Sequence, residues 1–146
     1  MITDEASLLI ARPIAAVFSY ADDFANAPRW LESCVVLKQT SPEARARGSA
    51  LHYHHRQGGR EGEMKGTVTV YERDARLDLE FADPMFQVAI ELEFAAEVDG
   101  TRVRQCITIT PLTMMGKLMT PLIRAGNQQQ VTSNLARLKE QLEAGV

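Results

Sequence analysis

The middle of the chain, from Gly48 to Thr110, alternates hydrophobic and polar positions with a period of two. Residues 76–81, for example, read Arg-Leu-Asp-Leu-Glu-Phe. This alternation predicts β-strands with one buried and one solvated face. The connections between strands are short, and Gly58-Gly59 is the strongest hairpin signal because glycine readily adopts a positive φ. The segment is therefore predicted to fold as an antiparallel meander.

Shorter elements precede this meander. Residues 7–11 form an apolar run that predicts a first strand. Two short helices are predicted next, over residues 13–21 and 24–31, with proline in the first turn of one and Asp22-Asp23 as the N-cap of the other. Residues 34–37 predict another strand. The helices are thus expected between the first two strands.

The C-terminal segment predicts one long helix that covers the apolar face of the sheet. Its apolar stripe is expected to consist of Leu118, Leu122, Ala125, Gln129, Leu135, Leu138 and Leu142. Pro121 is expected to start this helix or to kink it. The middle of the stripe is weak, since Gly126, Gln129 and Thr132 stand where leucines would be expected. Two interpretations remain open: these residues border a cavity that holds ligand or water, or the helix is rotated so that they point outward.

The order of these elements predicts an α+β fold. In it a curved antiparallel β-sheet wraps around a long C-terminal α-helix, with two short helices after the first strand. A length of 146 residues fits one domain, and we expect residues 1–146 to form it. Such a sheet leaves a space between itself and the helix, which is where a ligand is expected.

The chain resembles the START-like, helix-grip proteins of the SRPBCC superfamily, in their polyketide cyclase/dehydrase-like branch. The resemblance spans almost the whole chain and rests on the order and spacing of Ile10-x-Arg12-Pro13-Ile14-x-x-Val17-Phe18-x-Tyr20, Asp22/Asp23, Pro28-x-Trp30, Arg47-Gly48, Gly66-Thr67-Val68-Thr69-Val70, Asp99-Gly100-Thr101-Arg102-Val103 and Leu135-x-x-Leu138-Lys139-x-x-Leu142-Glu143. It implies a deep hydrophobic cavity in which members bind lipids, polyketides, sterols, hormones or quinones. Some members catalyse cyclisation or dehydration. The superfamily shares no catalytic residue, so the fold alone assigns no activity.

Tyr53 and His55 are the candidate catalytic residues. Both share the parity of Leu51 and are expected to face the cavity, where a phenol and an imidazole can polarise a carbonyl and move a proton. In the alternative interpretation, Tyr53 is ordinary packing with its hydroxyl bonded to the backbone, and His55 lies in water at the end of a hairpin. Strand parity, the predicted stripe of the C-terminal helix and the position of Trp30 after a short helix together give the expected ligand-binding residues: Trp30, Leu51, Tyr53, His55, Met64, Val68, Val70, Leu79, Phe81, Val88, Ile90, Leu92, Gln105, Ile107, Leu118, Leu122 and Gln129.

Gln105 is a polar residue on the inward face of the last strand. A buried amide needs partners, and a ligand or a helix residue such as Gln129 or Thr132 could supply them. Trp30 could gate the mouth of the cavity or simply seal the packing between helix and sheet. The methionines just before the long helix, Met114, Met115 and Met119, could line the opening or fill the core.

No metal ion and no other cofactor is expected. His52 and His54 lie on the same side of a strand, a geometry that can chelate a metal. Strand alternation, however, places both with Arg56 on the solvent side, and the sequence has no further histidine beyond His55. Two cysteines are too few for a disulfide framework or a thiolate zinc site.

Composition limits the partners. The net charge of −3 provides no basic field for nucleic acid. No run approaches the ~18 apolar residues of a membrane helix, and the acidic N-terminus is unlike a signal peptide, so a cytoplasmic location is expected. The expected partner is a small hydrophobic molecule, and a homodimer remains open.

Three functions are consistent with the sequence. The first is a cyclase or dehydrase acting on a polyketide-like substrate, and the second is a non-catalytic carrier or sensor of a lipid or quinone. The third is a protein-interaction module of the START-like type. For the first two, the ligand is expected to be elongated or polycyclic, with one or two oxygens that reach Tyr53, His55 or Gln105.

Overall fold

The computed structural model describes residues 1–57 and 59–144. Its strands are β1 (Ile2–Ile10), β2 (Cys34–Gln39), β3 (Ala50–Gln57), β4 (Arg60–Glu72), β5 (Arg76–Ala82), β6 (Phe86–Glu97) and β7 (Gly100–Pro111). Its helices are α1 (Ile14–Asp22), the short 3-10 helix η1 (Phe24–Asn26), α2 (Ala27–Trp30), α3 (Met114–Leu118) and α4 (Thr120–Ala144). The hairpin predicted at Gly58-Gly59 falls partly outside the described residues, although β3 and β4 pair as an antiparallel hairpin around it.

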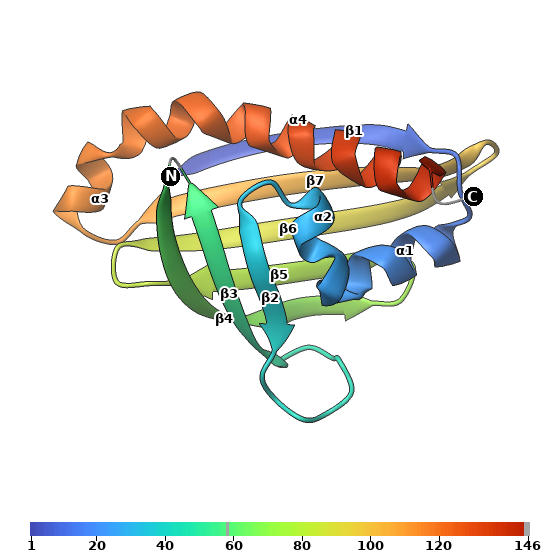
Figure 1. Cartoon of the computed structure of the whole chain (residues 1–146), viewed down its shortest axis with the longest axis horizontal. Coiled ribbons are helices and arrows are strands. Elements are labelled where there is room, and N and C mark those ends of the chain that lie inside the picture. Colours follow the sequence, from blue (N-terminus) through green and yellow to red (C-terminus); the bar gives the residue numbers. More distant parts are fainter. Residues whose placement is uncertain (58, 145–146) are drawn as a thin grey trace.

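All described strands belong to one antiparallel sheet with the order β1-β7-β6-β5-β4-β3-β2. The strands from β3 to β7 form the predicted meander, and β2 extends it by pairing with β3. At the far edge, β1 pairs with β7 from Ile2↔Ile109 to Ile10↔Thr101. Figure 1 shows the sheet curling strongly, with α4 lying along β1 across its concave side. The predicted α+β helix-grip architecture is therefore confirmed. Among the described helices, none combines the length and the apolar character needed to cross a lipid bilayer.

A β-bulge in β4 corrects the prediction for Val70. The register of β4 against β5 shifts between Val68 and Val70, so Val70 lies opposite Asp78 instead of continuing the inward face. Tyr71 takes the inward position, where its ring contacts Phe18 edge-on with centroids 5.9 Å apart. A bulge inserts one residue into a strand and reverses the parity of everything after it. Val70 consequently points to the outer face, away from the interior.

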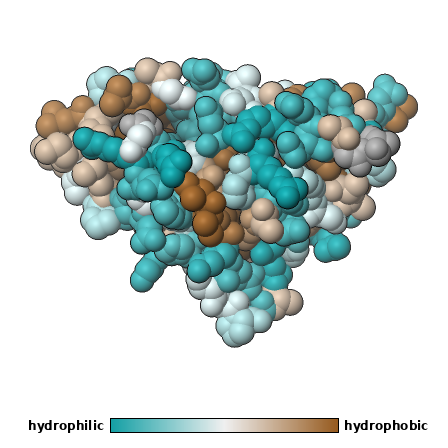
Figure 2. All heavy atoms as spheres, viewed as in Figure 1, coloured by the Kyte–Doolittle hydropathy of each residue, from teal (hydrophilic) through white to brown (hydrophobic). Residues whose placement is uncertain are grey.

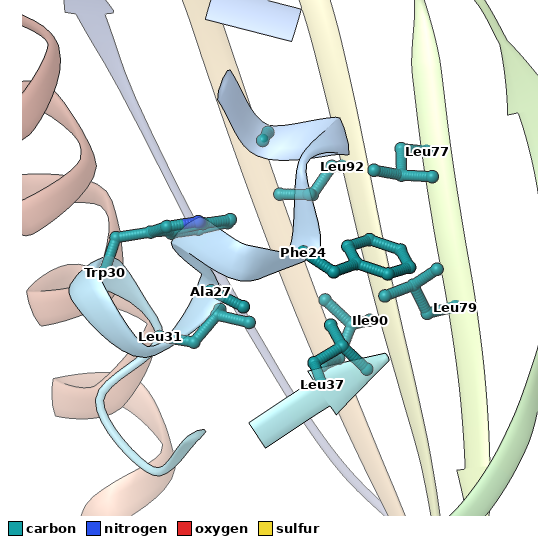
Figure 3. Close-up of a pocket in the computed structure, with 10 residues that line it drawn as sticks. Phe24, Ala27, Trp30, Leu31, Leu37, Leu77, Leu79, Ile90 and Leu92 are labelled. Carbon is teal, nitrogen blue, oxygen red and sulfur yellow. The ribbon is translucent and has the colours of Figure 1, made fainter. Parts of the chain in front are cut away.

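The two short helices form near their predicted positions and fill one end of the interior. Asp23 caps η1 by accepting the N–H of Ala25, as expected for an aspartate at that place. Figure 3 shows Phe24 and Trp30 pointing toward the leucines of β5 and β6. This end of the molecule is solidly packed, and the prediction that Trp30 seals the packing describes it better than a gate.

The long helix is confirmed, but the face that it buries differs from the predicted stripe. The buried residues of α4 are Asn127, Val131, Asn134, Leu135 and Leu138. Leu118 and Leu122 are 72% and 75% exposed, and Gln129 is exposed as well. The prediction that these three face the interior is wrong. Gly126 and Thr132 also point outward, so the rotated-helix interpretation is correct.

Polar contacts to β1 explain this rotation. Asn127 donates its side-chain N–H to the Asp4 carboxylate at 2.8 Å. At the other end of α4, Lys139 donates to the Leu9 carbonyl at 2.8 Å, and Glu143 accepts the N–H of Ala11 at 2.9 Å. These contacts fix which face of α4 meets the sheet. Apolar spacing alone does not encode them.

Candidate functional site

A cavity of about 150 Å³ lies between the inner face of the sheet and the segment where α3 meets α4. Its lining residues are Ser33, Tyr53, His55, Gln57, Met64, Asp83, Phe86, Val88, Ile90, Ile107, Ile109, Met119, Ile123 and Gln130. Most of these side chains are apolar. Apart from Asp83 on the β5–β6 turn, the polar ones gather on β3, on the turn before β2 and on α4. The result is a mainly apolar chamber with one polar wall.

The structure brings together only part of the predicted ligand-binding set. Six of those residues line the cavity: Tyr53, His55, Met64, Val88, Ile90 and Ile107. Trp30, Leu79 and Leu92 pack at the filled end instead. Others are buried in the core or amide network without lining the cavity: Leu51, Val68, Phe81 and Gln105. The remaining predicted residues point away from it: Val70, Leu118, Leu122 and Gln129.

Tyr53 is buried, and its hydroxyl pairs with a side chain rather than with the backbone. The Tyr53 Oη and Ser33 Oγ atoms are 2.8 Å apart. Gln130 Nε2 of α4 donates to the same Ser33 Oγ at 2.9 Å, and Gln57 Nε2 donates to Gln130 Oε1 at 3.4 Å. These four side chains, here called the polar wall, connect β3 to α4. Burial raises the pKa of Tyr53 well above its usual value, so the phenol stays protonated at neutral pH.

Counting protons on the polar wall shows an unused donor. Ser33 and Tyr53 carry one O–H each, and the hydrogen bond between them uses one of the two. Ser33 Oγ also accepts from Gln130, which consumes an acceptor but no hydroxyl proton. Within the described part of the chain, the second hydroxyl proton has no further acceptor. One O–H is therefore available to an acceptor atom in the cavity.

His55 lies beside Tyr53, with ring centroids 5.5 Å apart. It packs over Gly62, where an added Cβ would lie only 2.9 Å from His55 Cε1, so glycine makes room for the ring. His55 Nε2 is buried and has no hydrogen-bond partner among residues 1–57 and 59–144. Burial lowers the pKa of His55 below 6.5, and the opposing field of the Asp83 carboxylate only partly offsets this. The imidazole is thus mostly neutral at pH 7.

Gln105 is fully buried, but its partner is neither Gln129 nor Thr132. Asn134 of α4 donates to Gln105 Oε1 at 3.0 Å, and Asn134 Oδ1 accepts the N–H of Glu32 at 2.8 Å. The two predicted partners point outward on α4. Gln105 therefore belongs to a network that fastens α4 to β7 and to the α2–β2 turn.

His52 and His54 lie on the outer face of the sheet, as predicted. Their Nε2 atoms are each 3.5 Å from a glutamate oxygen on β4, Glu63 for His52 and Glu61 for His54. Arg56 pairs with Glu61 on the same face at 2.8 Å. These side chains form a row of polar contacts on the outer surface, separate from the cavity.

Sequence reasoning missed Ser33, Gln130 and Asp83. Ser33 lies in the turn before β2, where no periodic pattern assigns a direction to its side chain. Gln130 is one of three consecutive glutamines, and only the true rotation of α4 distinguishes it from its neighbours. Asp83 is held in the cavity lining by accepting the N–H groups of Met85 and Phe86, both at 2.7 Å. An Asp-Pro turn signal marks this residue, but not its proximity to His55.

Comparison with known proteins shows which family and which solved structures this chain resembles. A family model for polyketide cyclase / dehydrase and lipid transport matches residues 1–143. A search of curated proteins finds no significant match. Among solved structures, the chain is similar to a START superfamily protein from Mycobacterium smegmatis, with a TM-score of 0.81, 12% identity and 99% coverage of both chains.

Two further solved structures have the same fold. A protein from Thermus thermophilus superposes with a TM-score of 0.80 at 20% identity, over 98% of both chains. The Zhui aromatase/cyclase from a Streptomyces species gives a TM-score of 0.80 at 8% identity, over 97% of this chain and 93% of that one. At such identities the similarity establishes the fold alone. Because the family model spans nearly the whole chain, the chain belongs to the polyketide cyclase / dehydrase and lipid transport family, and its helix-grip fold agrees with this assignment.

Proposed function

We propose that this protein binds a compact, neutral, mostly apolar molecule that carries at least one acceptor oxygen. The observation that carries the proposal is the unused O–H of the Ser33–Tyr53 pair, both of whose side chains line the mainly apolar chamber. A carbonyl or ether oxygen would accept this proton. The Asp83 carboxylate in the cavity lining disfavours an anionic ligand, because like charges repel strongly where water is partly excluded.

The cavity volume limits the size of the ligand. Typical pockets for drug-sized molecules enclose ~300–1,000 Å³, whereas an apolar cavity of ~150 Å³ accepts a molecule the size of benzene. The volume of about 150 Å³ therefore supports a ligand of one or two rings, or a short acyl chain. This proposal replaces the elongated or polycyclic ligand expected from the sequence, because Trp30 and its neighbours fill the other end of the interior.

Acetophenone and isopropylbenzene provide matched probes, since they have nearly the same shape and only the ketone accepts a hydrogen bond. Either single variant, Ser33→Ala or Tyr53→Phe, leaves one hydroxyl on the polar wall. The double variant leaves none. We expect the double variant to bind acetophenone about tenfold more weakly, equivalent to ~1.4 kcal/mol, with isopropylbenzene affinity nearly unchanged. NMR titration of the labelled protein measures both affinities.

Tyr20→Phe is the matched control, because the Tyr20 hydroxyl contacts Gln141 at the surface, away from the cavity. It should leave both probe affinities unchanged. Equal losses for the two probes in the double variant would contradict donor recognition and indicate a general collapse of the cavity. In addition, native mass spectrometry of gently purified protein should detect a bound apolar compound. Consistent absence of such a compound would favour an interaction module instead.

A second candidate function is proton transfer on the bound molecule, as in a cyclase or dehydrase. It is supported by a neutral imidazole and a protonated phenol side by side in one cavity. In such a step His55 would take a proton from the carbon next to a carbonyl, while the polar wall would donate to the carbonyl oxygen. The resemblance in fold to an aromatase/cyclase is compatible with this chemistry.

Deuterium exchange at the central carbon of 1-phenylbutane-1,3-dione in heavy water tests this step. We expect the protein to accelerate exchange, and His55→Gln to reduce the acceleration by about a hundredfold while changing probe affinity less than about tenfold. Because burial lowers the pKa of His55, the neutral base persists below pH 6.5, and the protein-dependent rate should decline only at lower pH. His52→Gln on the outer face is the control. Unchanged exchange in His55→Gln would leave binding as the function.

A further inference from the structure

The outer side of the α3–α4 junction exposes an unusual number of large apolar side chains. We call residues 112–124 the elbow. Its exposed apolar side chains are Leu112, Met114, Met115, Leu118 and Leu122. Met114, Leu118 and Leu122 follow one another at intervals of four residues and are each at least 72% exposed. Figure 2 shows hydrophobic atoms gathered at this end of the molecule, around α3.

The elbow is also positively charged, in contrast to the rest of the chain. It contains Lys117 and Arg124, both exposed, and the sequence has no acidic residue between Asp99 and Glu140. In the described part of the chain, neither cation forms an ion pair with a carboxylate. The elbow is therefore a cationic, apolar surface on a protein whose net charge is −3.

The inner side of the same segment forms part of the cavity wall. Met119 and Ile123 line the cavity, whereas Leu118 and Leu122, their sequence neighbours, face outward. Gly116 anchors the elbow to the β5–β6 turn, since a Cβ there would lie 3.0 Å from the Met85 carbonyl oxygen. Only one layer of helix thus separates the exposed apolar surface from the cavity.

From this arrangement we infer that the elbow docks on an anionic phospholipid surface, with Met114, Leu118 and Leu122 inserted among the lipid chains. Exposed apolar side chains flanked by lysine and arginine are the pattern of helices that lie in a membrane interface. Anionic headgroups would neutralise Lys117 and Arg124. Docking places the cavity wall against the bilayer. An apolar ligand would then pass from the bilayer to the cavity, or back, without crossing water.

Charge argues against a second copy of the chain as the occupant of this surface. In a two-fold dimer the same patch meets itself, so Lys117 and Arg124 of each copy would face the elbow of the other copy, which contains two cations and no acidic residue. Such a contact buries like charges, which disfavours association. A lipid surface with negative headgroups satisfies both the apolar and the cationic groups.

Co-sedimentation of the full chain with lipid vesicles tests the inference. We expect binding to vesicles of phosphatidylcholine mixed with phosphatidylserine to be at least about tenfold tighter than to phosphatidylcholine alone. The double variant L118S/L122S should lower the affinity for the mixed vesicles by at least about tenfold. The variant K117Q/R124Q should remove the preference for phosphatidylserine. Higher salt should weaken binding of the unaltered chain.

Two control variants replace an exposed apolar residue and an exposed cation outside the elbow. Val98→Ser removes an apolar side chain that is fully exposed on the β6–β7 turn, and Arg47→Gln removes an exposed cation from the β2–β3 loop. Both should bind vesicles like the unaltered chain. Equal binding to both vesicle types, or no binding, would overturn the inference. So would light scattering that shows a dimer lost in L118S/L122S, because the elbow would then be a contact between copies.

Discussion

Replacing Trp30 with alanine is expected to lower the free energy of unfolding by about 3–5 kcal/mol, the usual range for removal of a buried tryptophan. Trp30 is only 1% exposed and fills the end of the interior opposite the cavity. Its neighbours, including Leu31 and Leu37, are carried by separate elements and cannot close the void together. The cost is therefore the lost burial of the indole plus the cavity left behind. Figure 3 shows the packing that would be interrupted.

Urea denaturation followed by circular dichroism measures this loss. Leu118→Ala is the informative comparison, because the sequence pattern assigned Leu118 to the interior while the structure exposes 72% of it. We expect Leu118→Ala to change the free energy of unfolding by less than about 0.5 kcal/mol. A loss below about 1.5 kcal/mol for Trp30→Ala would mean that this end of the interior is looser than the structure indicates.

Replacing Gly66 with alanine is expected to cost about 3 kcal/mol, at the upper end of the range for overpacking. A Cβ at this position would lie 2.0 Å from the Glu80 carbonyl oxygen and 2.6 Å from Phe81 Cδ1. The carbonyl belongs to the neighbouring strand β5, which pairs with β4 at Gly66↔Phe81. Relief of the clash therefore requires the two strands to separate locally.

The same glycine-to-alanine change at Gly126 is expected to stabilise the protein instead. Gly126 lies on the exposed side of α4, and an added Cβ there meets nothing within 4 Å. Alanine should raise the free energy of unfolding by about 0.5–1 kcal/mol, because glycine costs that much in a helix interior. Thermal or urea denaturation of both variants gives the comparison. A Gly66→Ala protein as stable as the unaltered chain would show that the β4–β5 spacing is wider than described.

Local sequence signals predicted most of the fold because each element has a strong one. Alternation specified the meander, Asp23 marked the start of η1, and the spacing of residues 135–142 indicated the helix that crosses the sheet. The inward direction of Tyr53 followed from strand parity and is confirmed by its burial. These predictions succeed because strand and helix periods relate neighbouring residues directly.

Predictions from strand parity failed where one irregular residue reversed the alternation of inward and outward positions. The bulge after Val68 turned Val70 outward, and nothing in the local pattern distinguishes a bulged strand from a regular one. The predicted apolar stripe of α4 was wrong for a related reason. The inward face of α4 carries Asn127 and Asn134, whose burial depends on partners in distant elements. A polar residue is placed inside a core only when the fold supplies its hydrogen bonds.

Local periodicity and motif order were enough to predict the order of elements, the antiparallel meander, the covering helix and the family resemblance. The folded structure was needed to show which end of the interior is hollow, that Ser33 and Gln130 join Tyr53 in the polar wall, and that the leucines of the elbow face outward. Local patterns could not predict these features, because hydrogen bonds and packing between residues far apart in the chain set the rotation of α4. That rotation decides which side chains of α4 line the cavity, which are buried in the core and which are exposed.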